Sequence, residues 1–520
     1  MASGAAFFEQ RDGAASAPPR SGFTRREPEK TLLHQVVREN LESFLAQVSA
    51  EDPDGPGLPS YVERELRRYL GCGIAARGFV RIVCGRCHEE MIVGFSCKGL
   101  GFCPSCLGRR MNDVAAHLVD RVLPFSPYRQ WVLSLPFRLR LVLAKRPALL
   151  GKVRTVFMRT VRAWQRLQAR RLGVPDAKTA AVCFTQRFGS RLDCNPHFHS
   201  LVPDAVFVEN DLKRIELVRL PRPKPSDVQK LVERIARRAQ ALLRRELGEA
   251  PAPDALDRLR SASQQLSLPA LPEPPEDRAA TLCARCEGFS LQAGRHLHEN
   301  DRDGLEALCR YCLRPPLAKD RLVRAADGRG ELVLELKRAM ADGRTTLRLT
   351  PLDLLRRLAG LVPPPRTHSI HYFGAFAAHA ALRGRIVPYS PRARRRCRTE
   401  ETCRDQLVLP WPKATVTTRL DDAHGPGPLR KAPAPRPREL DWRSLLRRCF
   451  ASEIYDCPCG GRRRVVAFVT DRVQAVDILA AIGLPTEPPP TARARAPPSQ
   501  AKMFDPAPGA IAVDPVCPDA

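Results

Sequence analysis

The sequence has no uncharged apolar run that approaches the ~20 residues of a membrane-spanning helix. Its most apolar stretch, at residues 131–150, is interrupted by three arginines and a lysine. The first residues, "MASGAAFFEQRDG", lack the basic and the long apolar segments of a secretory signal. These absences lead us to expect neither a membrane span nor a secretory leader, and therefore a cytoplasmic location.

Acidic residues are few relative to basic ones. The chain has 56 Asp and Glu against 85 Lys and Arg, which gives a formal net charge of +29 and a pI near 10.1. Such an excess favours a polyanionic partner. A basic surface in an Arg-rich proteome is the alternative interpretation. Because no amphipathic anchor for an acidic membrane is visible, the charge favours nucleic acid.

Length and composition indicate several folded regions separated by Pro- and Arg-rich segments. The 520 residues suggest about three domains, and 43% hydrophobic and 27% charged residues are globular values. We expect a disordered amino-terminus at 1–30, a helical and cysteine-containing region at 31–121, a large domain at 126–385, a basic linker at 386–440, a small module at 441–483 and a disordered tail at 484–520.

Local sequence patterns predict both helices and strands. Helical patterns occur at 31–48, 60–70, 109–121, 147–173, 226–247, 301–313 and 351–360. Strand patterns occur at 128–136, 178–189 and 197–208. Because only a short turn separates the last two strands, we expect them to form a β-hairpin.

The eighteen cysteines favour metal ligands or apolar packing over disulfides, provided that the chain stays in a reducing compartment. Cys84-x2-Cys87 and Cys103-x2-Cys106 form two pairs separated by fifteen residues. Each pair places two thiolates on one tight turn, and two such turns can close a tetrahedral cage around zinc. The spacing therefore predicts a structural zinc site made by these four cysteines.

Other cysteines and a histidine leave alternatives open. Cys72 and Cys97 are spare in this arrangement, and His88 can replace one thiolate. The carboxy-terminal "CPCGG" is one residue short of a CPxC turn, which argues against an ordinary zinc knuckle at Cys457 and Cys459. A second nominal set is Cys283, Cys286, Cys309 and Cys312. We do not favour that set, because it would place Tyr311 inside a metal-ligand turn.

The stretch "DCNPHFHSLVPDAVF" carries two histidines one residue apart. Side chains alternate along a strand, so His197 and His199 share one face while Phe198 points into the core. Both imidazoles can then reach one metal ion from a rigid strand. A purely structural pair of histidines is the alternative, since this spacing is a weak signal by itself.

Tyr311 lies in "LEALCRYCLRPPLA", on an expected short helix in a basic setting. A tyrosine there can attack a phosphate, with a divalent ion stabilising the charge that develops. The alternative is a helical tyrosine that packs against a sheet.

These motifs together resemble one family. "QRFGSRLDCNPHFHSLVPDAVF" followed by "DRDGLEALCRYCLRPPLA" closely resembles the rolling-circle transposases of the insertion-sequence-ninety-one type, which belong to the HUH (His, hydrophobic, His) endonucleases. "SCKGLGFCPSCLGRRMNDVAAHLVDRVLP" resembles their amino-terminal zinc-binding domain. "LDWRSLLRRCFASEIYDCPCGGRRRVVAFV" resembles their carboxy-terminal piece. The resemblance covers roughly residues 30–385 and 440–483 in the family's order.

The resemblance implies roles for particular residues. His197 and His199 would bind Mg²⁺ or Mn²⁺, and Tyr311 would be the nucleophile. Some relatives carry a second tyrosine four residues earlier, where this chain has Ala307, so the chain resembles the single-tyrosine version.

Further positions around these residues are candidates for the same site. Gln186, on the facing strand, is our choice for a third metal ligand, with Asp193 and Asn195 as alternatives. Arg310 and Arg314 flank the tyrosine and are candidates for phosphate contacts.

The resemblance also implies a fold and an activity. The fold would be α+β, with a central antiparallel sheet flanked by helices and preceded by a small zinc-ribbon-like domain. The region 126–385 would be the catalytic domain of a transposase that nicks and rejoins single-stranded DNA at element ends through a 5′-phosphotyrosine, in the bacterial cytoplasm at the nucleoid. The alternatives are a zinc-containing nucleic-acid-binding protein derived from a transposase, and a metal-dependent hydrolase that acts through water.

Overall fold

The computed structural model describes residues 25–247 without 54 and 56, 254–265, 282–386 without 319–320, 329, 337–338 and 340–342, and 455–495. The expected disordered segments lie largely outside these residues, as does most of the expected linker. Among the described residues, every helix is too short or too polar to span a lipid bilayer.

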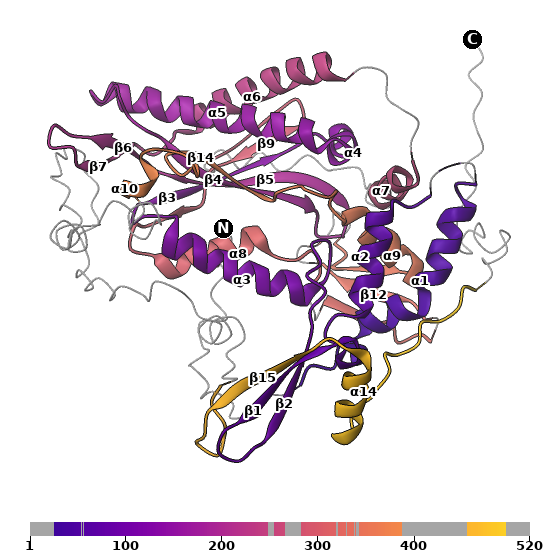
Figure 1. Cartoon of the computed structure of the whole chain (residues 1–520). Coiled ribbons are helices and arrows are strands. Elements are labelled where there is room, and N and C mark those ends of the chain that lie inside the picture. Colours follow the sequence, from indigo (N-terminus) through magenta and orange to yellow (C-terminus); the bar gives the residue numbers. More distant parts are fainter. Residues whose placement is uncertain are drawn as a thin grey trace, which may run out of the picture.

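A seven-stranded antiparallel sheet forms the centre of the molecule (Figure 1). Its order is β14-β4-β5-β3-β9-β8, with β10 also paired to β3. The strands are β3 (Tyr128–Ser134), β4 (Ala180–Phe188), β5 (Cys194–Pro203), β8 (Cys283–Cys286), β9 (Phe289–Gln292), β10 (His296–Leu297) and β14 (Ile370–Gly374). The expected α+β class is confirmed.

Helices cover both faces of this sheet. Helices α5 (Pro147–Arg171) and α6 (Pro225–Glu246) lie on one face, and α3 (Pro104–Arg121) and α8 (Arg302–Leu313) lie on the other (Figure 1). In α5 the buried Val153, Phe157 and Val161 recur every four residues, which makes one apolar stripe that packs on the sheet. The long basic helix expected at 147–173 is therefore confirmed.

The expected hairpin is the β4–β5 pair, which lies at the centre of the sheet. Gln186 of β4 faces His197 of β5, and β3 runs along the other edge of β5. The second strand begins at Cys194, three residues earlier than the pattern indicated. Strand β5 is hydrogen-bonded to a neighbour on both sides, so its backbone is rigid. Its side chains therefore point alternately to the two faces of the sheet in fixed positions.

A second core joins the amino-terminal helices to segments from the middle of the chain. Leu41 and Phe44 of α1 and Leu66 of α2 are buried in one cluster with Leu354 and Leu358 of α9. The elements around this core are α1 (Leu32–Ala50), α2 (Ser60–Leu70), α7 (Ala255–Gln265), α9 (Pro351–Leu361), β11 (Leu322–Arg324), β12 (Leu332–Glu335) and β13 (Thr346–Leu349).

A small three-stranded sheet pairs two strands of the amino-terminal region with one strand of the carboxy-terminal region. Strand β1 (Phe79–Cys84) pairs with β2 (Glu90–Gly94) on one side and with β15 (Arg463–Val469) on the other. Helix α14 (Arg472–Ala481) follows β15 and packs beside this sheet (Figure 1). Strand β15, which lies within the small module expected at 441–483, is thus one edge of the sheet that contains β1 and β2.

The remaining described elements connect these parts. They are the 3-10 helices η1 (Pro28–Lys30) and η2 (Ala75–Arg77), the helices α4 (Phe137–Lys145) and α10 (Arg383–Ile386), and the strands β6 (Ala205–Glu209) and β7 (Ile215–Arg219).

Candidate active site and metal centres

His197 and His199 lie on one face of β5, toward α8. Their ring centroids are 4.9 Å apart. Phe198 between them is fully buried on the opposite face and stacks on Phe157 of α5. The alternation of the strand therefore presents the two imidazoles side by side while Phe198 anchors the strand in the core.

Each histidine uses one ring nitrogen for a contact within the protein. Nδ1 of His197 donates to the backbone oxygen of Asn195 at 2.8 Å. Nδ1 of His199 lies 2.9 Å from Nε2 of the Gln130 side chain on β3. Nε2 of His199 is buried and has no hydrogen-bond partner in the described structure. Both contacts fix the ring orientation, and the bond to Asn195 leaves Nε2 of His197 without a proton.

Burial keeps both imidazoles neutral near pH 7. Desolvation lowers the pKa of His197 to about 4. Burial, and then the neighbouring His197, also lower the pKa of His199 well below its usual value. A neutral imidazole is the form that binds a metal ion.

Tyr311 lies on α8 next to these histidines. The carboxylate of Asp301 caps the start of the helix by accepting a hydrogen bond from the amide of Gly304. Leu308 and Cys312 bury one side of the helix against the sheet. The ring of Tyr311 meets that of His199 edge to face at 5.7 Å, and the residue as a whole stays 39% exposed.

Gln186 connects the strand of the hairpin to the end of α8. Its Nε2 donates to the backbone oxygens of Tyr311 at 3.0 Å and Cys312 at 2.9 Å, which are carbonyls of the last helical turn. These two bonds fix the orientation of the amide. Oε1 of Gln186 is buried and has no hydrogen-bond partner in the described structure. Gln186 is also the residue of β4 that faces His197 across the hairpin.

The two alternative third ligands lie near the hairpin turn. Asn195 precedes His197 by two residues on β5, and its Oδ1 is also buried without a partner. Asp193 is buried with its carboxylate against Gly189, where an added Cβ would lie 2.2 Å from Oδ1.

The two candidate arginines differ in their surroundings. The guanidinium of Arg314 lies 4.5 Å from the centre of the Tyr311 ring. Arg310 instead donates to the carboxylate of Glu306 at 2.8 Å, one turn back along the helix. A small pocket of about 60 Å³ beside Arg314 is also lined by Arg321.

The cysteines form two clusters, which corrects the single site expected from the sequence. Cys103 and Cys106 do share a site, and so do Cys84 and Cys87, but the two pairs are not in the same one. In the described structure one cluster consists of Cys72, Cys97, Cys103 and Cys106. The other consists of Cys84, Cys87, Cys457 and Cys459, while His88 is exposed and belongs to neither.

The first cluster is buried between α2 and the start of α3. Its four sulfurs lie within 4.8 Å of one another, and the Sγ atoms of Cys97 and Cys106 are 3.4 Å apart. Hydrogen bonding from Cys103 is the main cause that lowers the pKa of Cys72, to about 7. Four buried thiols that converge within this distance suit a tetrahedral zinc ion.

Cys106→Ser is expected to remove the zinc of this cluster and to destabilise the amino-terminal region by several kcal/mol, because structural zinc supplies folding energy. Thermal unfolding with metal analysis measures both effects. Cys286→Ser is the matched control, since Cys286 is half-buried and lies in neither cluster. A Cys106→Ser protein with wild-type zinc and stability would contradict this assignment.

The remaining nominal set is not brought together. Cys309 and Cys312 are buried in the core on the α8 side of the sheet, whereas Cys286 packs against the core on the α5 side. None of them belongs to a metal-binding group among the described residues. Tyr311 is therefore not part of a metal-ligand turn.

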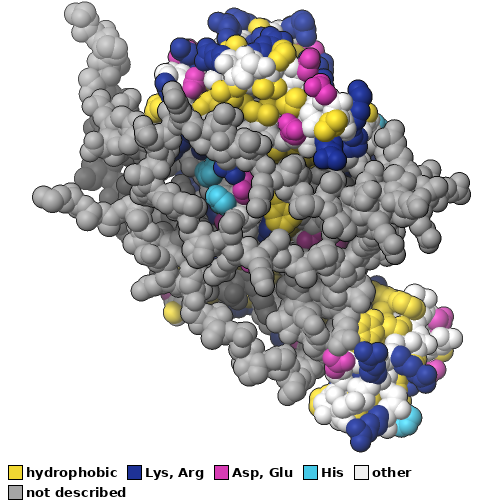
Figure 2. All heavy atoms as spheres, turned by 90° about the vertical axis from the view of Figure 1, so that its left-hand side faces the viewer, with side chains coloured by type: hydrophobic (Ala, Val, Ile, Leu, Met, Phe, Trp, Pro, Cys, Tyr) yellow, Lys and Arg dark blue, Asp and Glu magenta, His cyan; other side chains and the backbone are white. Residues whose placement is uncertain are grey.

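Basic side chains are prominent on the face drawn in Figure 2. Lys and Arg gather on its upper lobe and again at its lower tip. The upper lobe carries α5 and α6 in Figure 1, and both helices are rich in arginine. This distribution is typical of a protein that contacts the phosphates of a nucleic acid.

Comparison with protein families defines the class. Residues 180–383 match a family model described as "Putative transposase", and residues 36–135 match the model of the transposase zinc-binding domain. The protein is thus a transposase, and DNA is its partner. The chain belongs to the insertion-sequence-ninety-one type with its amino-terminal zinc-binding domain. Neither a curated protein nor a solved structure matches the chain.

Proposed function

We propose that this transposase cuts and rejoins single-stranded DNA at element ends, with Tyr311 as the nucleophile. The observation that carries the proposal is the convergence of four groups from three elements. His197 and His199 of β5, Gln186 of β4 and Tyr311 of α8 lie together on one face of the sheet, with the partly exposed Tyr311 beside unpartnered ligand atoms.

The donor set fits Mg²⁺ or Mn²⁺ bound by few protein atoms. Nε2 of His199 and Oε1 of Gln186 are buried without partners, and a bound cation would satisfy both. Two imidazoles and one amide oxygen leave the rest of the coordination sphere to water and phosphate, as is usual for these ions.

Gln130 acts in the proposed site by orienting His199. For Nε2 to bind a cation, Nδ1 must carry the proton and donate it to the amide oxygen of Gln130. The 2.9 Å contact suits this arrangement when the amide is turned so that its oxygen faces the ring.

The reaction needs a nucleophile, charge stabilisation and a leaving group. A bound divalent ion would polarise the scissile phosphate. The hydroxyl oxygen of Tyr311 attacks the phosphorus and gives up its proton, the bond from phosphorus to the 3′ oxygen breaks, and that oxygen takes a proton. The products are a 5′-phosphotyrosine and a free 3′ hydroxyl. The phosphodiester energy is kept, so a later 3′ hydroxyl can reverse the step without ATP.

The position of Arg314 supports a role beside the tyrosine. Its guanidinium lies over the Tyr311 ring, where it can stabilise a phenolate and contact a phosphate oxygen. Arg310 is held by Glu306 and contributes less to phosphate binding in this proposal. With Ala307 one turn earlier, a single tyrosine would serve each strand transfer in turn. The site of action would be the nucleoid in the bacterial cytoplasm.

The proposal is tested with end-labelled single-stranded oligonucleotides tiled over the DNA that flanks the gene. The purified full chain is incubated with them and Mn²⁺, then separated by denaturing electrophoresis. We expect a covalent protein–DNA adduct on at least one oligonucleotide, and its loss when EDTA is present. If the full set yields no adduct while binding is retained, the alternative of a non-catalytic DNA-binding protein replaces the proposal.

Gln186→Ala is expected to raise the Mn²⁺ concentration that gives half-maximal adduct formation by about 10- to 100-fold, because a ligand and its oriented oxygen are lost. Asn195→Ala is the matched control and should leave that concentration within about twofold. A Mn²⁺ titration of adduct yield measures both. The reverse pattern would assign the third ligand to Asn195.

A further inference from the structure

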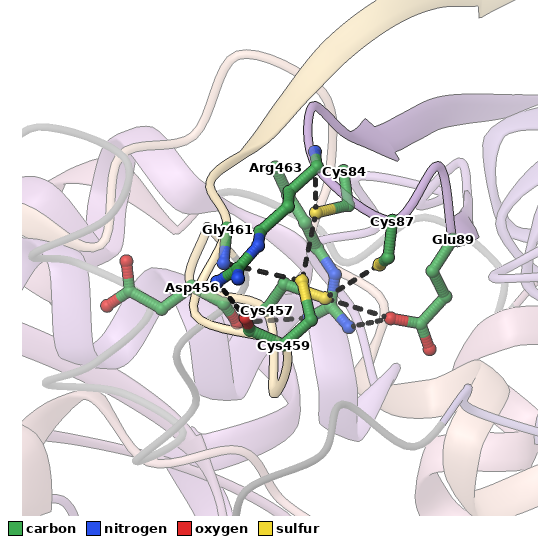
Figure 3. A network of polar contacts seen from close by, with 9 residues as sticks. Cys84, Cys87, Glu89, Asp456, Cys457, Cys459, Gly461 and Arg463 are labelled. Atoms are coloured by element: carbon green, nitrogen blue, oxygen red, sulfur yellow. Dashed lines mark hydrogen bonds and ion pairs between the residues drawn. The ribbon is translucent and has the colours of Figure 1, made fainter.

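The second cysteine cluster joins segments that are far apart in the sequence. Cys84 ends β1 and Cys87 lies in the turn that follows, whereas Cys457 and Cys459 precede β15. About 370 residues separate the two pairs along the chain. Figure 3 shows the four sulfurs pointing toward one another from these two loops.

The distances between the sulfurs fit a metal cage. Cys84 and Cys459 have their Sγ atoms 3.6 Å apart, and so do Cys87 and Cys457. A disulfide requires about 2.05 Å. A tetrahedron with Zn–S bonds of about 2.3 Å has edges of about 3.8 Å. All four sulfurs lie within 4.8 Å of one another, as such a cage demands.

We propose that Cys84, Cys87, Cys457 and Cys459 bind a second structural zinc ion, which fastens the carboxy-terminal segment to the amino-terminal zinc-binding domain. Neither family match reaches Cys457 or Cys459. The inference rests on these four residues and not on the nuclease activity.

The backbone around the cluster suits thiolate ligands. The amide of Arg86 donates to the sulfur of Cys84 at 3.4 Å, and that of Gly461 donates to Cys459 at 3.3 Å. Such bonds stabilise the ionised form of the thiol. The amide of Gly85 also donates to the oxygen of Arg462 at 2.9 Å, so the two loops are aligned by main-chain contact.

Two glycines explain how a pair of cysteines with one residue between them can serve here. Gly460 has φ of +79°, a conformation that favours glycine. A Cβ on Gly461 would lie 2.8 Å from Sγ of Cys84 and 2.6 Å from Cβ of Arg86. The short "CPCGG" loop therefore turns tightly and lets its backbone approach the opposite pair.

Charged groups at the site offset the negative charge of four thiolates around Zn²⁺. Arg463 is buried and donates to Glu89 at 2.7 Å, and the thiol of Cys457 donates to Oε2 of Glu89 at 3.2 Å, through a proton that a bound zinc ion would displace. Nη1 of Arg86 donates to the backbone oxygen of Cys459 at 2.8 Å. Two guanidinium groups therefore face one carboxylate at the rim of the cluster.

The direct test is the zinc content of the purified full chain. We expect two zinc ions per chain in the wild type, and one in Cys457→Ser/Cys459→Ser and in Cys87→Ser, whose cysteine is exposed and outside the core. Cys103→Ser should lose the other ion only, and Cys286→Ser should keep both. The proposal is overturned if Cys457→Ser/Cys459→Ser keeps the wild-type content, if it loses both ions, or if iron takes the place of zinc.

Hydrogen exchange tests the fastening itself. In Cys87→Ser we expect the amides of β15 to exchange at least about tenfold faster than in the wild type, because the ion that holds this edge strand is lost. The amides of β5 and the yield of covalent adduct should stay unchanged. Unchanged exchange in β15 together with loss of one zinc would overturn the fastening role.

Discussion

Tyr311→Phe is expected to lower formation of the covalent adduct by about a thousandfold or more, because the substitution removes the attacking oxygen and keeps the ring. The affinity for single-stranded DNA should stay within about twofold, since phosphate contacts dominate such affinity. Quantified adduct on denaturing gels, beside a binding titration at fixed salt, measures the two effects.

Tyr372→Phe is the matched control for this substitution. Tyr372 lies half-buried on β14 of the same sheet and takes no part in the site. If Tyr311→Phe still cleaves the DNA with normal yield and leaves a free 5′ phosphate, water is the nucleophile. The chain would then be a metal-dependent hydrolase.

His197→Ala and His199→Ala are each expected to reduce metal-dependent cleavage by about a hundredfold or more, because each removes one of the few protein ligands of the ion. Metal-independent binding of single-stranded DNA should be nearly unchanged. Cleavage rates across a Mn²⁺ titration check this, with His371→Ala on β14 as the control. Full activity of either variant at ordinary Mn²⁺ would show that the imidazoles are structural.

Local pattern was sufficient for the parts of the site that lie within one or two elements. The alternation of β5 predicts that His197 and His199 share a face, and the structure places them so. The hairpin pairs β4 with β5, so Gln186 comes to the same place as the histidines. Gln130 was not predicted, because the pairing of β3 with β5 is non-local and no local motif marks it.

The grouping of the cysteines could not be predicted from spacing. A short cysteine pair indicates that its two thiols share a turn, and both CxxC pairs do so. Which pairs combine depends on long-range folding. Cys72 and Cys97 meet the Cys103–Cys106 pair because the end of α2 and the start of α3 share one core. The Cys84–Cys87 pair meets the loop before β15. The available signals were the spare Cys72 and Cys97 near the two pairs and the distant short "CPCGG".

The cores were likewise only partly predictable. Amphipathic spacing predicts α1, α2 and α9 individually, and all three are confirmed. That they share one core is not visible in any local window, because about 300 residues separate α1 from α9 in the chain. The same holds for β15, whose partner strand lies near the other end of the chain.

The most direct test of the central claim is to locate the protein–DNA bond. The adduct formed with Mn²⁺ is digested with nuclease and protease, and the modified peptide is sequenced by mass spectrometry. We predict a nucleotide joined through its 5′ phosphate to Tyr311. Attachment to any other residue, or a product with no covalent bond and a free 5′ phosphate, would contradict the account.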